Sequence, residues 1–453
     1  MKRILLVLLV GLSLAGCKND KPSASRETSP GGIVYNRIYL PQAKDVAIRI
    51  AWPTDWATRG DVNQAVPYIG KDLILSGGAE GYPAGKAVEM FADLNADAGI
   101  APSVDNIRAG FVVPKENLDA AITIANAHLR APALDPEWLV RIRDGFAARM
   151  AETMAKPDQQ GFAALRWAAF GNSPVREALS LDKPGMVEAV TRDEVSTWHA
   201  QVFTRRGATI VIAGALSDTE AGKAVDALLG GLPEGGPVDP PAIQADFTPR
   251  RILLLQPDAE ASSLTFIGPL PPTAEGHEFD DIILVKALGV GEGSVLFNAV
   301  RTDLRAAYGF SAGLGAFSRA NRFLVLRGQV ETSKMAQVEE AVLKAYTTFR
   351  ETGPEGPVSN LKAPFAANIQ KTAGQPASVS FSALMGVLDG REAEQALALD
   401  KLLDDVSQDS LLARLQQAFP APDQFTILAV SPDANALPGA CVITEPEQAK
   451  ACR

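Results

Sequence analysis

The stretch PYIGKDLILSGGAEGYP, residues 67–83, predicts an apolar helix that ends in a glycine-rich turn. A strand precedes this helix, because DVAIRIAW (45–52) alternates apolar and polar residues as a half-buried strand does. The second half of the chain repeats the order, with the apolar stretch SSLTFIGPL (262–270) followed by ILVKALGVGEG (283–293). The sequence therefore predicts a duplicated unit of strand, helix and glycine turn.

The end of the first unit is predicted from a second group of motifs. TRDEVSTWHAQVF (191–203) opens with a Thr-x-x-Glu capping box, and it leads into the buried strand ATIVIA (208–213). A segment rich in Pro, Gly and acidic residues follows, as is typical of a linker. We expect three parts: an N-terminal domain over 33–233, a linker over 234–250 and a C-terminal domain over 251–453.

The turn after the first helix ends in Tyr82-Pro83-Ala84-Gly85. This turn and its helix resemble the active-site region of the pitrilysin/insulinase family of zinc peptidases, whose helix carries H-x-x-E-H. The order and spacing of the other motifs extend the resemblance over most of the chain. It implies an α+β fold of two homologous half-domains like those of the mitochondrial processing peptidase, each a β-sheet covered by helices.

The zinc ligands of that family are replaced in this chain. Alignment on the turn places Tyr68, Lys71 and Asp72 at the positions of His, Glu and His. The register through residues 134–137 places Ala148 at the position of the later glutamate ligand. Such a site needs two neutral imidazoles, a third protein ligand and a carboxylate base. The chain has three histidines, His128, His199 and His277, and they are too far apart in sequence to form a local two-histidine motif. We expect no cofactor in this chain and zinc in a partner subunit.

One further part of the family's site is expected in the second half. Residues 288–310, LGVGEGSVLFNAVRTDLRAAYGF, are similar to a glycine-rich loop and helix in which an Arg and a Tyr seven residues apart face the catalytic cleft. Arg301 and Tyr308 hold these positions. The resemblance implies that they contact the substrate and stabilise negative charge at the scissile carbonyl, in trans where the family works as a dimer. The alternative is a solvated arginine and a packing tyrosine.

Other apparent catalytic motifs have simpler interpretations. Gly309-Phe310-Ser311-Ala312-Gly313 fits G-x-S-x-G, but a nucleophile elbow needs a strand, a turn and a helix, with a histidine later in the chain. Here strand-like residues (322–331) follow, and no histidine occurs after position 277. Paired carboxylates are expected on solvated helix faces: Asp280-Asp281, Glu339-Glu340 and Asp404-Asp405.

The N-terminus indicates export. Lys2 and Arg3 precede an apolar run that ends in Leu14-Ala15-Gly16-Cys17, so residues 1–16 are expected to be a signal peptide. The cleavage region resembles a bacterial lipobox, which implies acylation of Cys17. An ordinary signal peptide with an incidental cysteine is the alternative. Lys18 after the cysteine implies the outer membrane, and the polar residues 17–32 predict a flexible tether.

Composition and the two other cysteines agree with a periplasmic protein. A net charge of −10 argues against nucleic acid as a partner. Cys441 and Cys452 are expected to form a disulfide in an oxidising compartment, the alternative being two free thiols.

Three functional hypotheses follow. The first is a subunit without activity of its own in a periplasmic, lipid-anchored zinc peptidase of the insulinase type. It would supply Arg301 and Tyr308 to a zinc-bearing partner that degrades unstructured peptides. The second is a structural or assembly lipoprotein on the same fold, with no role in proteolysis. The third, a peptidase with a rearranged metal site, is disfavoured by the substitutions at the ligand positions.

Overall fold

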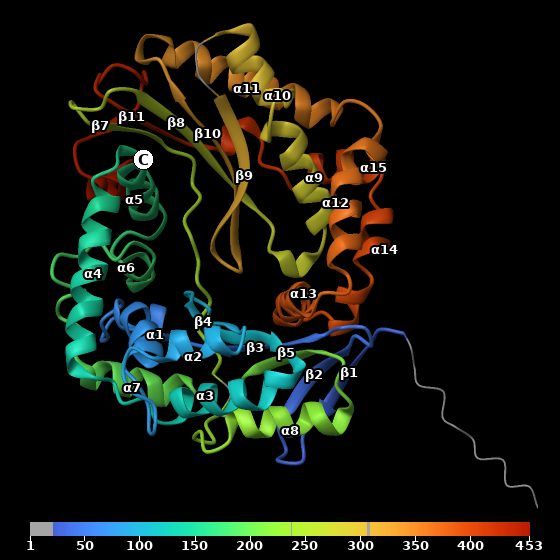
Figure 1. The fold of residues 1–453 in the computed structure, drawn as a ribbon. Helices are drawn as coiled ribbons and strands as arrows, with labels where there is room; N and C mark the ends of the chain where they lie inside the picture. Colours follow the sequence, from blue (N-terminus) through green and yellow to red (C-terminus); the bar gives the residue numbers. More distant parts are fainter. Residues whose placement is uncertain (1–20, 237, 306–308) are drawn as a thin grey trace, which may run out of the picture.

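The computed structural model describes residues 21–236, 238–305 and 309–453, which form two half-domains of mixed α and β structure (Figure 1). Each half contains a six-stranded sheet, ordered β1-β2-β6-β3-β5-β4 in the first and β12-β7-β11-β8-β10-β9 in the second. Helices cover the sheets on both faces. The predicted α+β fold of two half-domains is confirmed.

The elements of the first half alternate between strands and helices. Its strands are β1 (Ser23–Thr28), β2 (Val34–Tyr39), β3 (Asp45–Pro53), β4 (Asp97–Pro102), β5 (Asn106–Pro114) and β6 (Thr209–Gly214). Its helices are α1 (Val66–Ser76), α2 (Ala87–Asp93), α3 (Leu118–Arg130), α4 (Pro136–Met154), α5 (Pro157–Phe170), α6 (Pro174–Ser180), α7 (Arg192–Val202) and α8 (Asp218–Leu229).

The second half has a related set of elements. Its strands are β7 (Arg251–Leu255), β8 (Ser262–Leu270), β9 (Gly309–Ser318), β10 (Asn321–Val330), β11 (Thr426–Ser431) and β12 (Cys441–Ile443). Its helices are α9 (Glu278–Gly289), α10 (Val295–Phe297), the π-helical segment η4 (Asn298–Asp303), α11 (Met335–Thr352), α12 (Val358–Thr372), α13 (Pro376–Leu388), α14 (Leu399–Asp404) and α15 (Gln408–Gln417).

The duplication extends to strand order and direction. β2-β6-β3-β5-β4 corresponds to β7-β11-β8-β10-β9, with one parallel pair followed by antiparallel pairs in each sheet. The sixth strands differ. β1 comes from the N-terminal end and pairs antiparallel with β2, whereas β12 comes from the C-terminal end and pairs parallel with β7. The duplicated unit is therefore a five-stranded sheet with its helices.

The core of the first half forms where helices α1 and α7 pack together on the sheet. Ile69 and Leu73 of α1 are fully buried, as are Trp198 and Phe203 at α7. Thr191 caps α7 through the backbone N–H of Glu194, and the Glu194 carboxylate accepts the Thr191 N–H in return. This confirms the predicted capping box, which fixes where the helix begins.

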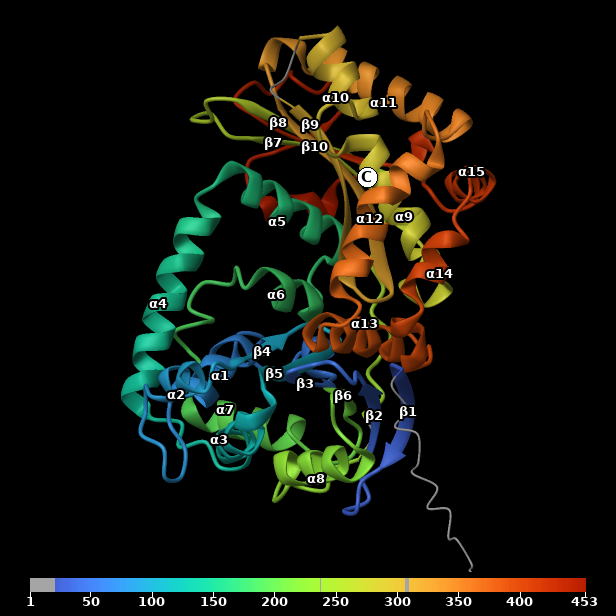
Figure 2. The same ribbon diagram turned by 45° about the vertical axis from the view of Figure 1, so that its right-hand side comes forward.

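The two halves exchange a helix. α5 of the first half packs on the second sheet, where Leu165 contacts the buried cluster of Leu428 and Val430. α13 of the second half packs on the first sheet through Val379 and Leu384 (Figure 2). A Cβ at Gly161 of α5 would lie 3.0 Å from both Leu428 and Val430, so glycine permits this close approach. Each sheet therefore has one face completed by the other half.

The hairpin turns of the two sheets also meet. The backbone N–H of Arg319, in the β9–β10 turn, donates to the carboxylate of Asp105 in the β4–β5 turn at 2.9 Å. Arg319 also pairs with Asp389, directly after α13. Burial raises the pKa of Asp105. These contacts add a polar link to the apolar helix exchange.

Residues 23–32, predicted as part of a flexible tether, are held in place by other parts of the first half. Ser23–Thr28 forms β1, paired with β2 from Ser23↔Tyr39 to Thr28↔Val34. The next turn is tied to α8, because the Asp226 carboxylate accepts the Gly31 N–H at 2.7 Å and a bond from Ser29. The prediction of a flexible segment over 17–32 is therefore wrong from Ser23 onward, since backbone pairing and the Asp226 contacts order these polar residues.

The C-terminal tail closes on the second sheet. Cys441, in β12, and Cys452 form a disulfide whose Cα atoms lie 5.8 Å apart. Arg250 donates from Nε to the Cys452 carbonyl at 3.1 Å. The tail is thus attached both to β7 and to the end of the linker.

Candidate functional site

Helix α1 is the helix that the resemblance aligns with a zinc-binding helix, but its side chains present different chemistry. It has Pro67 in its first turn, where the missing N–H leaves no hydrogen bond unmade. Tyr68, Lys71 and Asp72 occupy its partly buried face, at the spacing i, i+3, i+4. The Lys71 ammonium pairs with the Asp72 carboxylate at 2.5 Å, and the Tyr68 hydroxyl donates to the Ala178 carbonyl at 3.0 Å. The three side chains thus satisfy one another or the backbone.

The surroundings of α1 oppose cation binding as well. Ala148 lies on the exposed part of α4 and offers only a methyl group. Arg166 of α5 interacts electrostatically with Tyr68, and burial lowers the pKa of its guanidinium. Burial also raises the pKa of Tyr68, so its phenol stays neutral at pH 7. Lys71 and Arg166 place positive charge where the family holds a divalent metal, so the residues present do not fit zinc.

Each of the three histidines contacts a backbone carbonyl or a carboxylate. His128 is buried and its Nδ1 lies 2.8 Å from the Ile124 carbonyl oxygen, while His199 Nε2 lies 2.7 Å from that of Leu129. Burial lowers the pKa of both rings. His277 lies before α9, beside Asp280. Within residues 21–236, 238–305 and 309–453, no group of three or more His, Cys, Asp or Glu side chains is arranged to hold a metal ion.

We therefore expect the purified chain to contain less than a tenth of a zinc ion per molecule and to cleave no peptide. The measurement is elemental analysis of protein prepared without chelator. A homologue with an intact H-x-x-E-H, purified in parallel, is the control that zinc survives the preparation. One zinc per chain together with chelator-sensitive cleavage would contradict this expectation.

Arg301 lies in η4, the π-helical segment between α10 and the residues that lead to β9. Its side chain is exposed, and the guanidinium carbon lies 5.6 Å from the centroid of the Phe297 ring. π-Helical turns are rare and occur frequently at functional sites. Arg305 has φ +51°, a conformation that is uncommon for a residue with a side chain, and Lys334 donates to its carbonyl at 3.1 Å. Tyr308 lies outside the described residues.

The structure separates the two predicted parts of the site. Both views place α1 at the lower end of the molecule and α10, which continues into η4, at the upper end (Figures 1 and 2). η4, which carries Arg301, directly follows α10 and so belongs to the other half of the molecule from α1.

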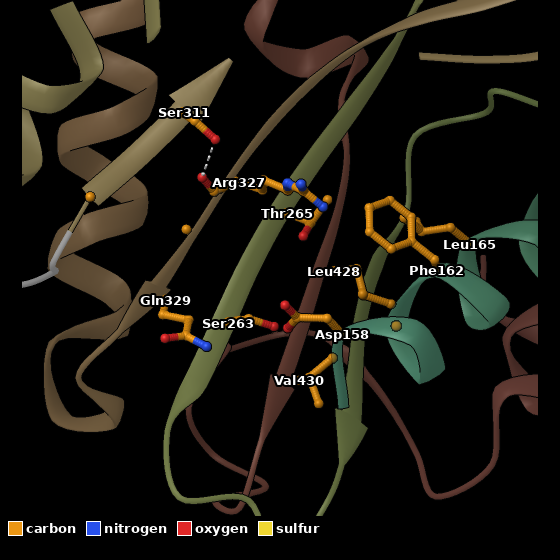
Figure 3. A pocket seen from close by; sticks show the side chains of 13 residues that line it. Asp158, Phe162, Leu165, Ser263, Thr265, Ser311, Arg327, Gln329, Leu428 and Val430 are labelled. Carbon is orange, nitrogen blue, oxygen red and sulfur yellow. Dashed lines mark hydrogen bonds between the residues drawn. The ribbon is translucent and has the colours of Figure 1, made fainter. Parts of the chain in front are cut away.

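A cavity of about 240 Å³ lies between α5 and the second sheet (Figure 3). Asp158 and Phe162 come from α5, and Ser311, Arg327 and Gln329 come from β9 and β10. The Arg327 guanidinium carbon lies 5.5 Å from the centroid of the Phe162 ring. The sequence contained no signal for this cavity, because its polar residues come from both halves.

The other candidate motifs are resolved by their positions in the fold. Ser311 lies within β9 and its hydroxyl donates to the Arg327 carbonyl at 3.3 Å, so it is not on a nucleophile elbow. Asp404 and Asp405 are exposed, as expected. The expectation is wrong for Asp280 and Asp281, which are both buried.

Asp281 is buried because it neutralises two arginines from distant elements. Its carboxylate lies 3.1 Å from Arg322 of β10 and 2.8 Å from Nε of Arg414 of α15. Asp280 accepts a bond from the Ser410 hydroxyl at 2.8 Å. Glu339 is likewise partly buried and pairs with Arg251. These carboxylates are structural ion-pair partners rather than a catalytic pair.

The fold and these sequence features agree with comparisons to known proteins. Residues 189–361 match the family described as the Peptidase M16 inactive domain. A crystal structure of a peptidase M16 inactive domain from Pseudomonas fluorescens has a TM-score of 0.76 at 15% identity, covering 90% of this chain and 98% of that one. A protease from Helicobacter pylori has a TM-score of 0.74 at 11% identity, covering 90% and 99%. No match is found among curated proteins.

Longer proteases contain this fold as one part. The periplasmic protease PqqL from Escherichia coli has a TM-score of 0.69 at 14% identity, covering 94% of this chain but 50% of that one. Pitrilysin has a TM-score of 0.62 at 14% identity, covering 92% and 45%. The chain therefore has the two-half fold of the M16 peptidases. Its residues 189–361 also match the model of the inactive domain of that family.

Proposed function

We propose that this chain is the non-catalytic subunit of a periplasmic, membrane-anchored zinc peptidase that degrades unstructured peptides. The observation that carries the proposal is the arrangement of the site: α1 has a Lys71–Asp72 ion pair in place of ligands, while Arg301 lies in an exposed π-helical turn. Arg301 and Tyr308 then act on a peptide held at the zinc helix of a partner subunit. Their role is to donate hydrogen bonds to the scissile carbonyl oxygen as it gains negative charge.

The separation of α1 and η4 supports action in trans. A heterodimer with a zinc-bearing subunit of the same fold would bring η4 of this chain opposite the partner's zinc helix. The periplasmic location of PqqL, a protease of this fold, supports the same compartment here.

The test is reconstitution with an insulinase-family chain of the same organism that has an intact H-x-x-E-H. Each protein is purified alone, and the two are mixed and separated by gel filtration. Cleavage of an unstructured peptide should need both chains and should follow the co-eluting fraction. Co-elution without any gain in cleavage would favour the structural lipoprotein instead.

Attachment to the membrane is proposed through acylated Cys17, which lies outside the described residues. Among the described helices, none is long and apolar enough to cross a bilayer. Five residues separate Cys17 from β1, and an extended chain of this length spans at most about 18 Å. The β1 edge of the first sheet would therefore lie close to the lipid surface.

Cys17→Ser is expected to abolish attachment, because no acyl chain can be added to the serine hydroxyl by this route. The protein should either move to the soluble periplasmic fraction or remain as an unprocessed precursor. The measurement is fractionation followed by intact-mass analysis. The control is the double variant Cys441→Ser/Cys452→Ser, which removes the tail disulfide and leaves Cys17 in place. A Cys17→Ser protein of mature mass that stays with the outer membrane would contradict lipidation as the anchor.

A further inference from the structure

One arginine beside helix α1 has donors that nothing in the chain uses. Arg166 of α5 interacts electrostatically with Tyr68 of α1 and with Asp182. In the part of the chain that the structure describes, its guanidinium forms no hydrogen bond and no ion pair. The side chain is partly buried, and each of its nitrogens keeps some contact with solvent. A ligand can therefore reach the N–H donors of Arg166.

The carboxylates near this guanidinium are bound by other cations. Asp182 pairs with Arg176 at 2.5 Å, and the Glu177 carboxylate lies 3.5 Å from the same arginine. On α1, the Asp72 carboxylate pairs with Lys71. The guanidinium of α5 is thus left without a bonded counter-ion. Burial lowers its pKa, because the charged form is partly removed from water.

Two elements build this cationic site, and α6 joins them. α6 packs against α5, and its Ala178 carbonyl accepts the Tyr68 hydroxyl at 3.0 Å. Lys71 follows Tyr68 by three residues, so both lie on the same face of α1. Arg166 and Lys71 therefore place cationic donors at the face that the resemblance assigns to a metal ion. This chemistry disfavours a metal cation and suits an anion.

We propose that Arg166 binds a carboxylate group of a peptide at this face of α1. The planar fork of a guanidinium matches the two oxygens of a carboxylate, and such a charged pair is stronger than a neutral hydrogen bond. Both an acidic side chain and a free C-terminus carry this group. The inference rests on the proposed function in taking a peptide as the ligand, and it adds the chemical group that this chain recognises.

The first experiment is isothermal titration calorimetry of the mature chain with three unlabelled, unstructured peptides. The parent peptide has one aspartate and a free C-terminus. Asparagine replaces the aspartate in the second peptide, and the C-terminus of the third is an amide. One of these changes should weaken binding at least tenfold, which identifies the carboxylate that is bound. Equal affinity for all three peptides, or no binding of the parent at millimolar concentration, would overturn the proposal.

The second experiment assigns the carboxylate to Arg166. Arg166→Gln removes the charge, so it should weaken binding of the parent peptide at least tenfold and abolish the difference among the peptides. Arg166→Lys keeps the charge without the fork and should retain part of the affinity. Arg206→Gln, at a side chain that is 69% exposed, is the matched control and should stay within twofold. A difference among the peptides that persists in Arg166→Gln would refute this site. Circular dichroism verifies that the variants are folded.

A free anion is the competing occupant. Titration with inorganic phosphate decides this: phosphate binding at least tenfold tighter than the parent peptide, and lost in Arg166→Gln, would overturn the peptide assignment. These titrations use one chain, so they are independent of cleavage by the pair. Carboxylate-dependent binding without cleavage in the reconstituted pair would refute the proposed function alone, and cleavage with carboxylate-independent binding would refute the Arg166 site alone.

Discussion

Replacing Arg301 with alanine is expected to lower the turnover of an unstructured peptide about a hundredfold when the chain is assembled with a zinc-bearing partner. The physical reason is that a guanidinium aimed at the scissile carbonyl stabilises charge that exists only in the transition state, and removing one such donor costs roughly 10²- to 10³-fold in kcat. The measurement is steady-state cleavage by the reconstituted pair, with assembly verified by gel filtration.

The pattern of kinetic effects distinguishes this role from simple binding. If Arg301 only held the substrate, its removal would raise KM and leave kcat unchanged. Arg301→Lys should recover part of the lost turnover, because it keeps the charge but not the two-pronged donor. Tyr308→Phe is expected to act in the same direction. Arg206→Ala removes an arginine that is 69% exposed in the first half and serves as the matched control. Parental kcat in an assembled Arg301→Ala pair would contradict the proposed role.

Asp281→Ala is expected to destabilise the chain by about 3–5 kcal/mol, which is the usual cost of removing one partner from a buried ion pair. The carboxylate is fully buried, and Arg322 and Arg414 are 8% and 7% exposed in their side chains. Its removal leaves two buried guanidinium groups without their counter-charge. The loss should appear as a lower midpoint in urea unfolding followed by circular dichroism.

Two controls separate this mechanism from a general effect of losing an aspartate. Asp405→Ala, at an exposed position, should change stability by less than about 0.5 kcal/mol. A triple variant in which Asp281, Arg322 and Arg414 become apolar residues of similar volume should recover much of the loss, since no charge is then left unpaired. Equal stability of Asp281→Ala and Asp405→Ala would show that the buried triad contributes nothing.

The repeated strand-and-helix pattern could be predicted from the sequence because its signals are local. The apolar residues in 45–52 and the capping box at Thr191 each depend on residues that are neighbours along the chain. The expectation that 45–52 is half-buried is wrong, because β3 is buried on both faces and α13 covers the second one. Asp281 could not be predicted in the same way, since Arg322 and Arg414 are 41 and 133 residues away. A pair of aspartates in a helix is usually solvated, and only tertiary contacts reverse that expectation.

β1 and the cavity escaped prediction for related reasons. Ser23–Thr28 has no apolar periodicity, and it becomes a strand through pairing with β2 and the anchoring of the next turn by Asp226. Asp158 and Arg327 meet because α5 crosses to the second sheet. The positions on α1 followed from a resemblance in the turn that ends at Gly85. The assignment of Arg301 and Tyr308 remains a prediction from the same resemblance.

The exchange of α5 and α13 has a consequence for the origin of the chain. Each half alone would leave an apolar sheet face uncovered, formed by residues such as Ile38 and Val211 in one sheet and Leu428 and Val430 in the other. Two identical ancestral halves could cover these faces only by donating the same helix to each other, as in a domain-swapped dimer with twofold symmetry. Joining them through the segment 234–250 makes that swap internal to one polypeptide. Each half therefore depends on the other for the cover of one sheet face, so neither half is expected to fold stably when expressed alone.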